Sequence, residues 1–361
     1  MIAARVLIGL ASAAVVLATV GSAMRTMLLP RGIPARIGRF VFVLMRWVFA
    51  ARAGRNASYE RRDRVMAFYA PASLLALLVT WMTLVYVSYI GLFWAVSPRP
   101  LIAAYELSGS SMFTLGFDRP GDLASLSLSF TESALGLFLL ALLITYLPLL
   151  YSAFSRREAA VTALEVRAGA PPSGVTMLER FWRLQRMDRL NEVWTQWEAV
   201  FVEMEESHTS FPALNFFRSP QPDHSWVTAA GAVLDGAALY ASAFDLPRVI
   251  DAEICIRAGY LALRRIADFF RLNYKTDPRP DDTTSIQREE FDVALDEMAA
   301  AGLPVKADRD AAWQAFNGWR VNYDEVLLAL ATLTMAPYAP WSSDRGLSSA
   351  LPSLILRAPR G

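Results

Sequence analysis

The chain has 361 residues, of which 54% are hydrophobic and 19% charged, and its mean hydropathy is +0.30. Soluble globular chains are usually about 45–50% apolar, so this composition predicts a membrane part joined to a water-soluble part. The single cysteine, Cys255, excludes an internal disulfide and a cysteine-rich metal site. Only two histidines are present, His208 and His224, so we do not expect a histidine-based metal cage. We predict no metal site and no cofactor.

Charge is segregated along the chain. Residues 1–64 contain 11 arginines and two acids, whereas residues 65–154 contain two arginines and four acids. Arginine and lysine close to a membrane span stay on the cytoplasmic side. The asymmetry therefore predicts a chain that is oriented across a membrane, with a basic cytoplasmic segment at residues 25–65.

The first apolar run, Val6–Ala23, has 18 uncharged residues and allows two interpretations. The small residues Gly21, Ser22 and Ala23 could end a cleaved secretory signal. Alternatively, residues 1–24 form a slightly short transmembrane helix that is retained. Cleavage would leave the basic segment outside, so we favour a retained helix with its N-terminus outside.

The basic segment itself contains a candidate interfacial helix. Ile37–Arg55 is apolar but is interrupted by arginines, and Arg39 and Arg46 lie on one helical face. Such a helix can lie in the inner membrane surface, with its arginines on lipid headgroups and its apolar face in the acyl boundary. We assign Phe40, Leu44, Trp47 and Val48 to that face. The alternative is a helix packed on the protein's own cytoplasmic domain.

Two further spans are predicted within residues 66–154. Ala72–Val96 has 25 residues without a charge and Ser133–Tyr151 has 19, and Arg156 and Arg157 close the second span on the cytoplasmic side. The connection between the two spans therefore faces outward or dips back into the membrane. Glu132, at the start of the second span, either lines a water path or sits at the interface.

Residues 155–338 are expected to form a cytoplasmic helical domain. Leu178–Glu206 has apolar residues at three- and four-residue spacings, which predicts one amphipathic helix. Trp226–Phe244 is expected to be a buried central helix in which Asp235 is hydrogen-bonded, for example to an arginine. A last helix is predicted over Arg309–Met335, and a loose tail over residues 339–361. Nucleotide-binding and hydrolase motifs are absent from the sequence, so we predict that the protein is not an enzyme.

The connection at residues 100–122, PLIAAYELSGSSMFTLGFDRPGD, combines apolar and polar residues. Pro100 suits the first turn of a helix, and Leu101–Phe113 is long enough for a short re-entrant helix. The negative end of its dipole would favour a cation near Thr114, where backbone carbonyls could replace the hydration shell of the ion. Glu106, Asp118 and Asp122 would add negative potential at the outer mouth. The alternative is a plain external connection.

Over residues 66–154 the pattern resembles the potassium-channel superfamily, with an outer helix (72–96), a pore helix and filter-like loop (100–122) and an inner helix (133–151). Thr114, Leu115, Gly116 and Phe117 match Thr-Val-Gly-Tyr of the filter, and Asp118 replaces the following glycine. The resemblance implies that Ser110 and Ser111 lie at the end of the pore helix and that Gly136 is an inner-helix hinge. It also implies a homotetramer that conducts monovalent cations such as K⁺. Because the second filter glycine normally needs a conformation that other residues avoid, the resemblance does not imply selectivity for K⁺.

The sequence thus predicts an all-α membrane protein with three transmembrane helices, a pore-loop-like re-entrant segment and a cytoplasmic helical domain. Its expected setting is a bacterial-type plasma membrane, with lipids and monovalent cations as partners and no nucleic acid. The alternative function is a membrane-anchored scaffold with a non-conducting loop. A third hypothesis is a membrane-bound enzyme that uses His208 or His224 with nearby carboxylates.

Overall fold

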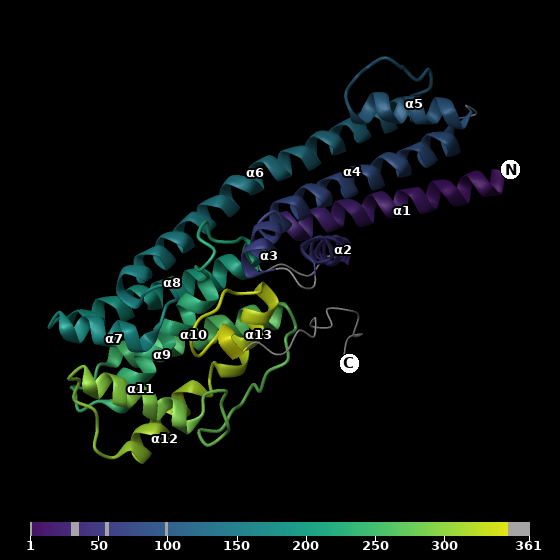
Figure 1. Ribbon diagram of the computed structural model, residues 1–361. Coiled ribbons are helices and arrows are strands. Elements are labelled where there is room, and N and C mark those ends of the chain that lie inside the picture. The colour runs from purple at the N-terminus through teal and green to yellow at the C-terminus, as the bar shows by residue number, and fades with distance from the viewer. Residues whose placement is uncertain (1, 30–35, 55–57, 98–99, 346–361) are drawn as a thin grey trace. The chain divides into compact units, whose positions relative to one another are not determined.

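The computed structural model describes residues 2–29, 36–54, 58–97 and 100–345 (Figure 1). Helices account for 76% of the structure and the described residues contain no strand, which confirms the all-α prediction. The chain divides into two compact units. Unit 1 comprises Met1–Ala57 and Val65–Ser152, and unit 2 comprises Ser58–Arg64 and Ala153–Gly361.

Among the described residues, three helical segments are long and apolar enough to cross a membrane, as the sequence predicts. They are α1 (Ile2–Met27), the stretch Tyr59–Val96, and α6 (Leu123–Ala168), which runs from unit 1 into unit 2. The middle stretch consists of α3 (Tyr59–Met66) and α4 (Tyr69–Val96). Unit 1 also contains α2 (Arg36–Ala53) and α5 (Leu101–Met112).

Helices α1 and α4 lie side by side and run in opposite directions (Figure 1). The Arg5 guanidinium stacks 5.1 Å from the ring of Trp94, and Trp81 Nε1 donates to Ser22 Oγ at 3.3 Å. Glycines allow the close approach, since a Cβ at Gly9 would lie 3.1 Å from a side chain of α4. Small residues at such contacts are typical of helix pairs in membranes.

The outer surface of unit 1 is apolar. Large aliphatic and aromatic side chains of all three long helices are exposed, and they include Leu10, Leu17, Val79, Val87, Leu137, Leu140 and Ile144. Many large apolar side chains exposed on helices of this length are typical of contact with a membrane or with another protein. On α2 the exposed side chains include the predicted interfacial face, Phe40, Leu44, Trp47 and Val48.

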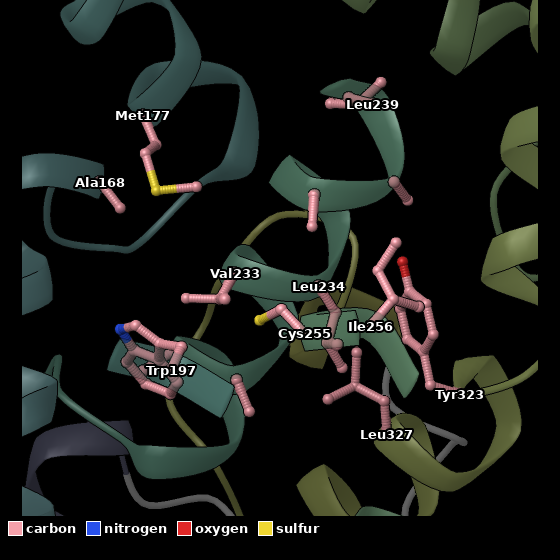
Figure 2. Packing of buried hydrophobic residues seen from close by; sticks show 14 of the residues in the cluster. Ala168, Met177, Trp197, Val233, Leu234, Leu239, Cys255, Ile256, Tyr323 and Leu327 are labelled. Carbon is pink, nitrogen blue, oxygen red and sulfur yellow. The ribbon is translucent and has the colours of Figure 1, made fainter. Parts of the chain in front are cut away.

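Unit 2 is a helical bundle around α9 (Trp226–Ala243), in which every residue except Ala241 is buried. Figure 2 shows Val233 and Leu234 of α9 among Cys255 and Ile256 of α10 and Leu327 of α13. The predicted buried central helix is therefore confirmed. The surrounding helices are α7 (Gly174–Arg183), α8 (Leu190–Ser210), α10 (Ile250–Phe269), α11 (Arg288–Ala300), α12 (Arg309–Arg320) and α13 (Asp324–Thr334).

Three expected features of unit 2 differ in the structure. The single helix over Leu178–Glu206 is wrong, because α7 ends in a turn at Gln185, whose φ is +54°, and the chain restarts at α8. Arg309–Met335 is likewise two helices, α12 and α13. The start of the expected loose tail, Ala339–Arg345, is packed: Ala339 is buried and Arg345 pairs with Glu290. Residues 346–361 lie outside the described residues.

A buried ion cluster joins α9, α12 and α13. The guanidinium of Arg320 pairs with Asp235, donates to Asp324 at 2.7 Å and donates to the Trp341 carbonyl at 2.6 Å. Tyr323 donates to Asp235 at 2.9 Å, so the prediction of a hydrogen-bonded Asp235 is confirmed. Burial opposes the charge of Arg320, but the attraction of the two aspartates outweighs it and keeps the pKa of Arg320 above its usual value.

We expect Arg320→Leu to lower the free energy of unfolding of unit 2 by about 3–5 kcal/mol, because it leaves two buried carboxylates without their cation. The matched control is Arg309→Leu, which removes the exposed pair with Asp296 and should cost at most about 1 kcal/mol. Denaturant unfolding of the full chain in detergent, followed by tryptophan fluorescence, measures both. Equal destabilisation by the two changes would contradict a structural role for the cluster.

Candidate functional site: the α5–α6 contact and the loop between them

Helix α5 is a half-length helix that folds back along α4. Ser108 Oγ donates to the carbonyl of Tyr86 at 3.1 Å. Tyr86 lies ten residues before the end of α4 at Val96, which is about 15 Å along the helix. That is about half of the 30 Å hydrocarbon core of a bilayer. The carboxyl end of α5 therefore reaches the middle part of the apolar helices against which it packs.

A row of polar side chains joins α5 to α6, and we call it the polar seam. From α5 it contains Ser108 and Ser111, and from α6 Ser129, Glu132 and Ser133. Ser108 Oγ lies 2.6 Å from Glu132 Oε1, the hydroxyls of Ser111 and Ser129 are 2.5 Å apart, and Ser133 Oγ donates to the Ser111 carbonyl at 2.6 Å. Because these side chains pair across the contact, the seam fixes the register of α5 on α6.

Gly136 lies at the end of the α5–α6 contact, against the last residue of α5. A Cβ at Gly136 would lie 2.8 Å from the carbonyl oxygen of Met112, the last residue of α5. The structure thus gives a packing reason for a glycine at the position that the resemblance assigns to a hinge. The hinge itself stays a prediction.

The filter-like run starts where α5 ends, and its first residues cap the carboxyl end of this helix. Thr114 N donates to the Ser111 carbonyl at 3.1 Å and Leu115 N donates to the Ser110 carbonyl at 2.9 Å. This pair of bonds is the Schellman pattern, in which the residue after the cap is left-handed. That residue is usually glycine, but here it is Thr114 with φ +53°, and Gly116 follows with φ +73°. A β-branched residue in this region is an outlier, and such strain is concentrated at functional sites.

The side chains after Thr114 point away from unit 1. Leu115 is 63% exposed and Phe117 is 65% exposed, and no atom lies within 4 Å of a Cβ built on Gly116. Ser110 Oγ accepts from the backbone N–H of Asp118 at 3.3 Å, which ties the run back to α5. In a single chain, the filter-like residues form an exposed loop.

The acids assigned to the mouth have different positions. Glu106 is exposed on α5. Asp122 caps the start of α6, where its Oδ1 accepts from Ser125 N at 2.8 Å. The sequence did not predict the pairing of Glu132 with Ser108: Glu132 was expected to line a water path or to sit at the interface, and the structure buries it against α5. Its signal in the sequence was the helical spacing of Ser125, Ser129, Glu132 and Ser133.

Both histidines lie in unit 2, where they contact other side chains of the bundle. His208 is fully buried, its ring 4.7 Å from that of Trp226, with Arg157 at 3.4 Å from Nε2. Burial and then the charge of Arg157 hold the pKa of His208 well below its usual value of 6.5. His224 Nε2 lies 3.2 Å from Glu165. The described residues include no group of three or more potential metal ligands.

A small cavity lies beside His224 and is lined by Asn215, Arg218, Trp226 and Thr334, among others. Its volume is about 20 Å³, which is enough for about one water molecule. The Oδ1 atom of Asn215 and the Nδ1 atom of His224 are buried without a hydrogen-bond partner. The cavity is thus too small for an organic ligand.

Comparison with protein-family models, curated proteins and solved structures gave no match to this chain.

We expect Gly136→Ala to lower the melting temperature of the full chain in detergent, because the new methyl group meets the Met112 carbonyl; overpacking of this kind costs about 1–3 kcal/mol. Gly21→Ala in α1 is the matched control, since a Cβ there meets no atom within 4 Å. Both changes add the same helix propensity. If Gly136→Ala is as stable as Gly21→Ala, α5 does not contact α6 at this point.

We expect the stability of unit 2 to fall with acid in a way that depends on His208. Below about pH 6.5 the unfolded chain protonates this histidine while the folded chain does not, so up to about 1.4 kcal/mol is lost per pH unit. His208→Asn should therefore show a shallower loss between about pH 6.5 and 5 in urea unfolding. An unchanged pH dependence in the variant would show that His208 is protonated equally in both states.

Proposed function

We propose that this chain is one subunit of an oligomeric cation pore, in which residues 113–118 supply the ion path. One observation carries the proposal: the run 113–118, of which residues 113–117 are exposed, follows the carboxyl end of a half-length helix packed between long apolar helices. In lipid, irregular backbone is tolerated only where protein or water surrounds it. An exposed loop at this depth therefore calls for neighbouring chains, a water-filled path, or both.

The chemistry of the loop favours cations. The carboxyl end of α5 directs the negative end of its dipole toward Thr114, and backbone carbonyls of the following run are suited to replace a hydration shell. Glu106 and Asp118 add negative charge on the same segment. Asp118 stands where the potassium-channel filter has its second glycine, so we infer a pore that passes both Na⁺ and K⁺.

One loop cannot enclose an axis, so the pore needs several copies of the chain. A cyclic homotetramer is the simplest arrangement that meets this need and agrees with the resemblance. Exposed Leu115 and Phe117 support it, because large apolar side chains on a loop gain from burial against neighbouring copies.

In this proposal the membrane is a bacterial-type plasma membrane, the N-terminus is outside and unit 2 lies in the cytoplasm. Unit 2 has an extensive core of its own and would serve assembly or regulation. The exposed apolar face of α2, with arginines nearby, supports an interfacial position on anionic lipid.

We expect the full chain in liposomes to pass Na⁺ and K⁺, and Gly116→Val to reduce the flux about tenfold or more. Gly116 has φ +73°, and a left-handed conformation costs other residues about 1–2 kcal/mol. Valine would therefore shift the loop. The measurement is the flux of each cation into vesicles that contain equal amounts of protein.

Gly121→Val is the control from the same loop, because Gly121 has no positive φ and meets no neighbour within 4 Å. It should retain the flux of the wild type. Absence of flux from well-folded wild-type protein would remove the pore and leave the membrane-anchored scaffold. Equal loss in both variants would show that the loop does not act through Gly116.

A further inference from the structure

Glu132 is a carboxyl group without a cation inside unit 1. It is fully buried on α6, between α4 and α5. Oε1 lies 2.6 Å from Ser108 Oγ, and Oε2 has no hydrogen-bond partner. Among the residues that the structure describes, no basic side chain pairs with it. A buried ionised carboxylate without a partner is strongly unfavourable, so the geometry calls for a neutral group.

The number of hydrogens available around Ser108 leads to the same conclusion, that the carboxyl group of Glu132 is neutral. Ser108 Oγ lies within hydrogen-bond distance of two oxygens, Glu132 Oε1 at 2.6 Å and the Tyr86 carbonyl at 3.1 Å. A serine hydroxyl has one hydrogen to donate, so it cannot serve two acceptors. If Glu132 carries a proton on Oε1, it donates to Ser108 Oγ and Ser108 donates to Tyr86. Both hydrogen-bond donors in this series, Glu132 and Ser108, then have an acceptor.

The groups that face Glu132 from the neighbouring helices are uncharged. Tyr86 and Tyr89 face it from α4, and Tyr89 donates to Thr131 Oγ1 on α6 at 3.0 Å. From α5 the facing polar group is Ser108, and no further charged group of α5 or α6 acts on the carboxyl. Phenols keep their protons through the physiological pH range. A proton exchanged by this cluster therefore belongs to Glu132.

We propose that Glu132 is a proton-binding site that holds α5 in place between α4 and α6. With the proton bound, a continuous series of hydrogen bonds runs from Glu132 on α6 through Ser108 to the backbone of α4. When the proton leaves to water, Ser108 must turn to the carboxylate and releases the Tyr86 carbonyl. The unpaired charge then draws in water, and α5 shifts together with the loop that follows it.

The proton site depends only on the helix packing of unit 1, so Glu132 would bind a proton in a conducting or a silent protein. It makes the position of α5 dependent on pH. The conservative variant Glu132→Gln keeps a donor at the same place and cannot lose it, so it should hold α5 at every pH.

The first test is infrared difference spectroscopy of the full chain in lipid nanodiscs during a pH titration. We expect the C=O stretch of a buried protonated carboxylic acid, which disappears as the pH rises and is missing in Glu132→Gln. Glu106→Gln, which removes an exposed acid of α5, is the matched control and should keep the band. A wild-type band that survives in Glu132→Gln, or no such band at all, would overturn the site.

The second test follows α5 itself. Spin labels at two exposed positions, Ile102 on α5 and Leu137 on α6, report the distance between the helices by electron paramagnetic resonance. We expect the distance distribution to change over the pH range in which the infrared band is lost. The same labels on the Glu132→Gln background should show no change. A pH-dependent shift of equal size in both proteins, or in neither, would overturn the link between the proton and α5.

Discussion

The hydrogen bonds between α5 and α6 are the constraint on which unit 1 depends. A membrane offers no water to an unpaired hydroxyl or carboxyl, so each such group has to find its partner within the protein. Ser111 pairs with Ser129, Ser133 pairs with the Ser111 backbone, and Ser108 links Glu132 to α4. Helix α5 has twelve residues, of which Ala104, Leu107 and Met112 lie in the apolar core of unit 1, and the seam adds polar contacts to this packing. The seam therefore sets the position of α5 along α4 and α6, and with it the point where the loop after α5 begins.

Unit 2 depends on an analogous constraint, because Arg320 is fully buried and must be paired. Asp235 on α9 and Asp324 on α13 supply the two carboxylates, and the Trp341 backbone supplies a carbonyl. This requirement fixes three helices and the segment Ala339–Arg345 to one another. In both units a charged or polar group in an apolar surrounding selects one arrangement of helices where apolar packing alone would permit several.

Much of the fold could be predicted from the sequence, since uncharged runs of span length and the buried α9 with its Asp235 follow from composition and spacing. The helix breaks at Gln185 and between Arg320 and Asp324 could not, because neither glycine nor proline marks them. At the candidate site, the short helix was visible in the sequence. The left-handed Thr114 was not, because a β-branched residue is among the least expected there. The pairing of Glu132 with Ser108 could not be predicted, because the two residues lie on different helices and meet only when α5 folds back along α4.

We propose that α5 enters the membrane and that its carboxyl end is the deeper end. The most direct measurement is the depth of single spin labels in liposomes, obtained from their accessibility to oxygen and to a water-soluble nickel complex, with Cys255 replaced by alanine. Labels at Ile102 and Phe113, which are both exposed, mark the two ends of α5. We expect the label at Phe113 to lie deeper than the label at Ile102 by on the order of 10 Å, given a rise of about 1.5 Å per residue. Two labels of equal, shallow depth in the aqueous layer would contradict it.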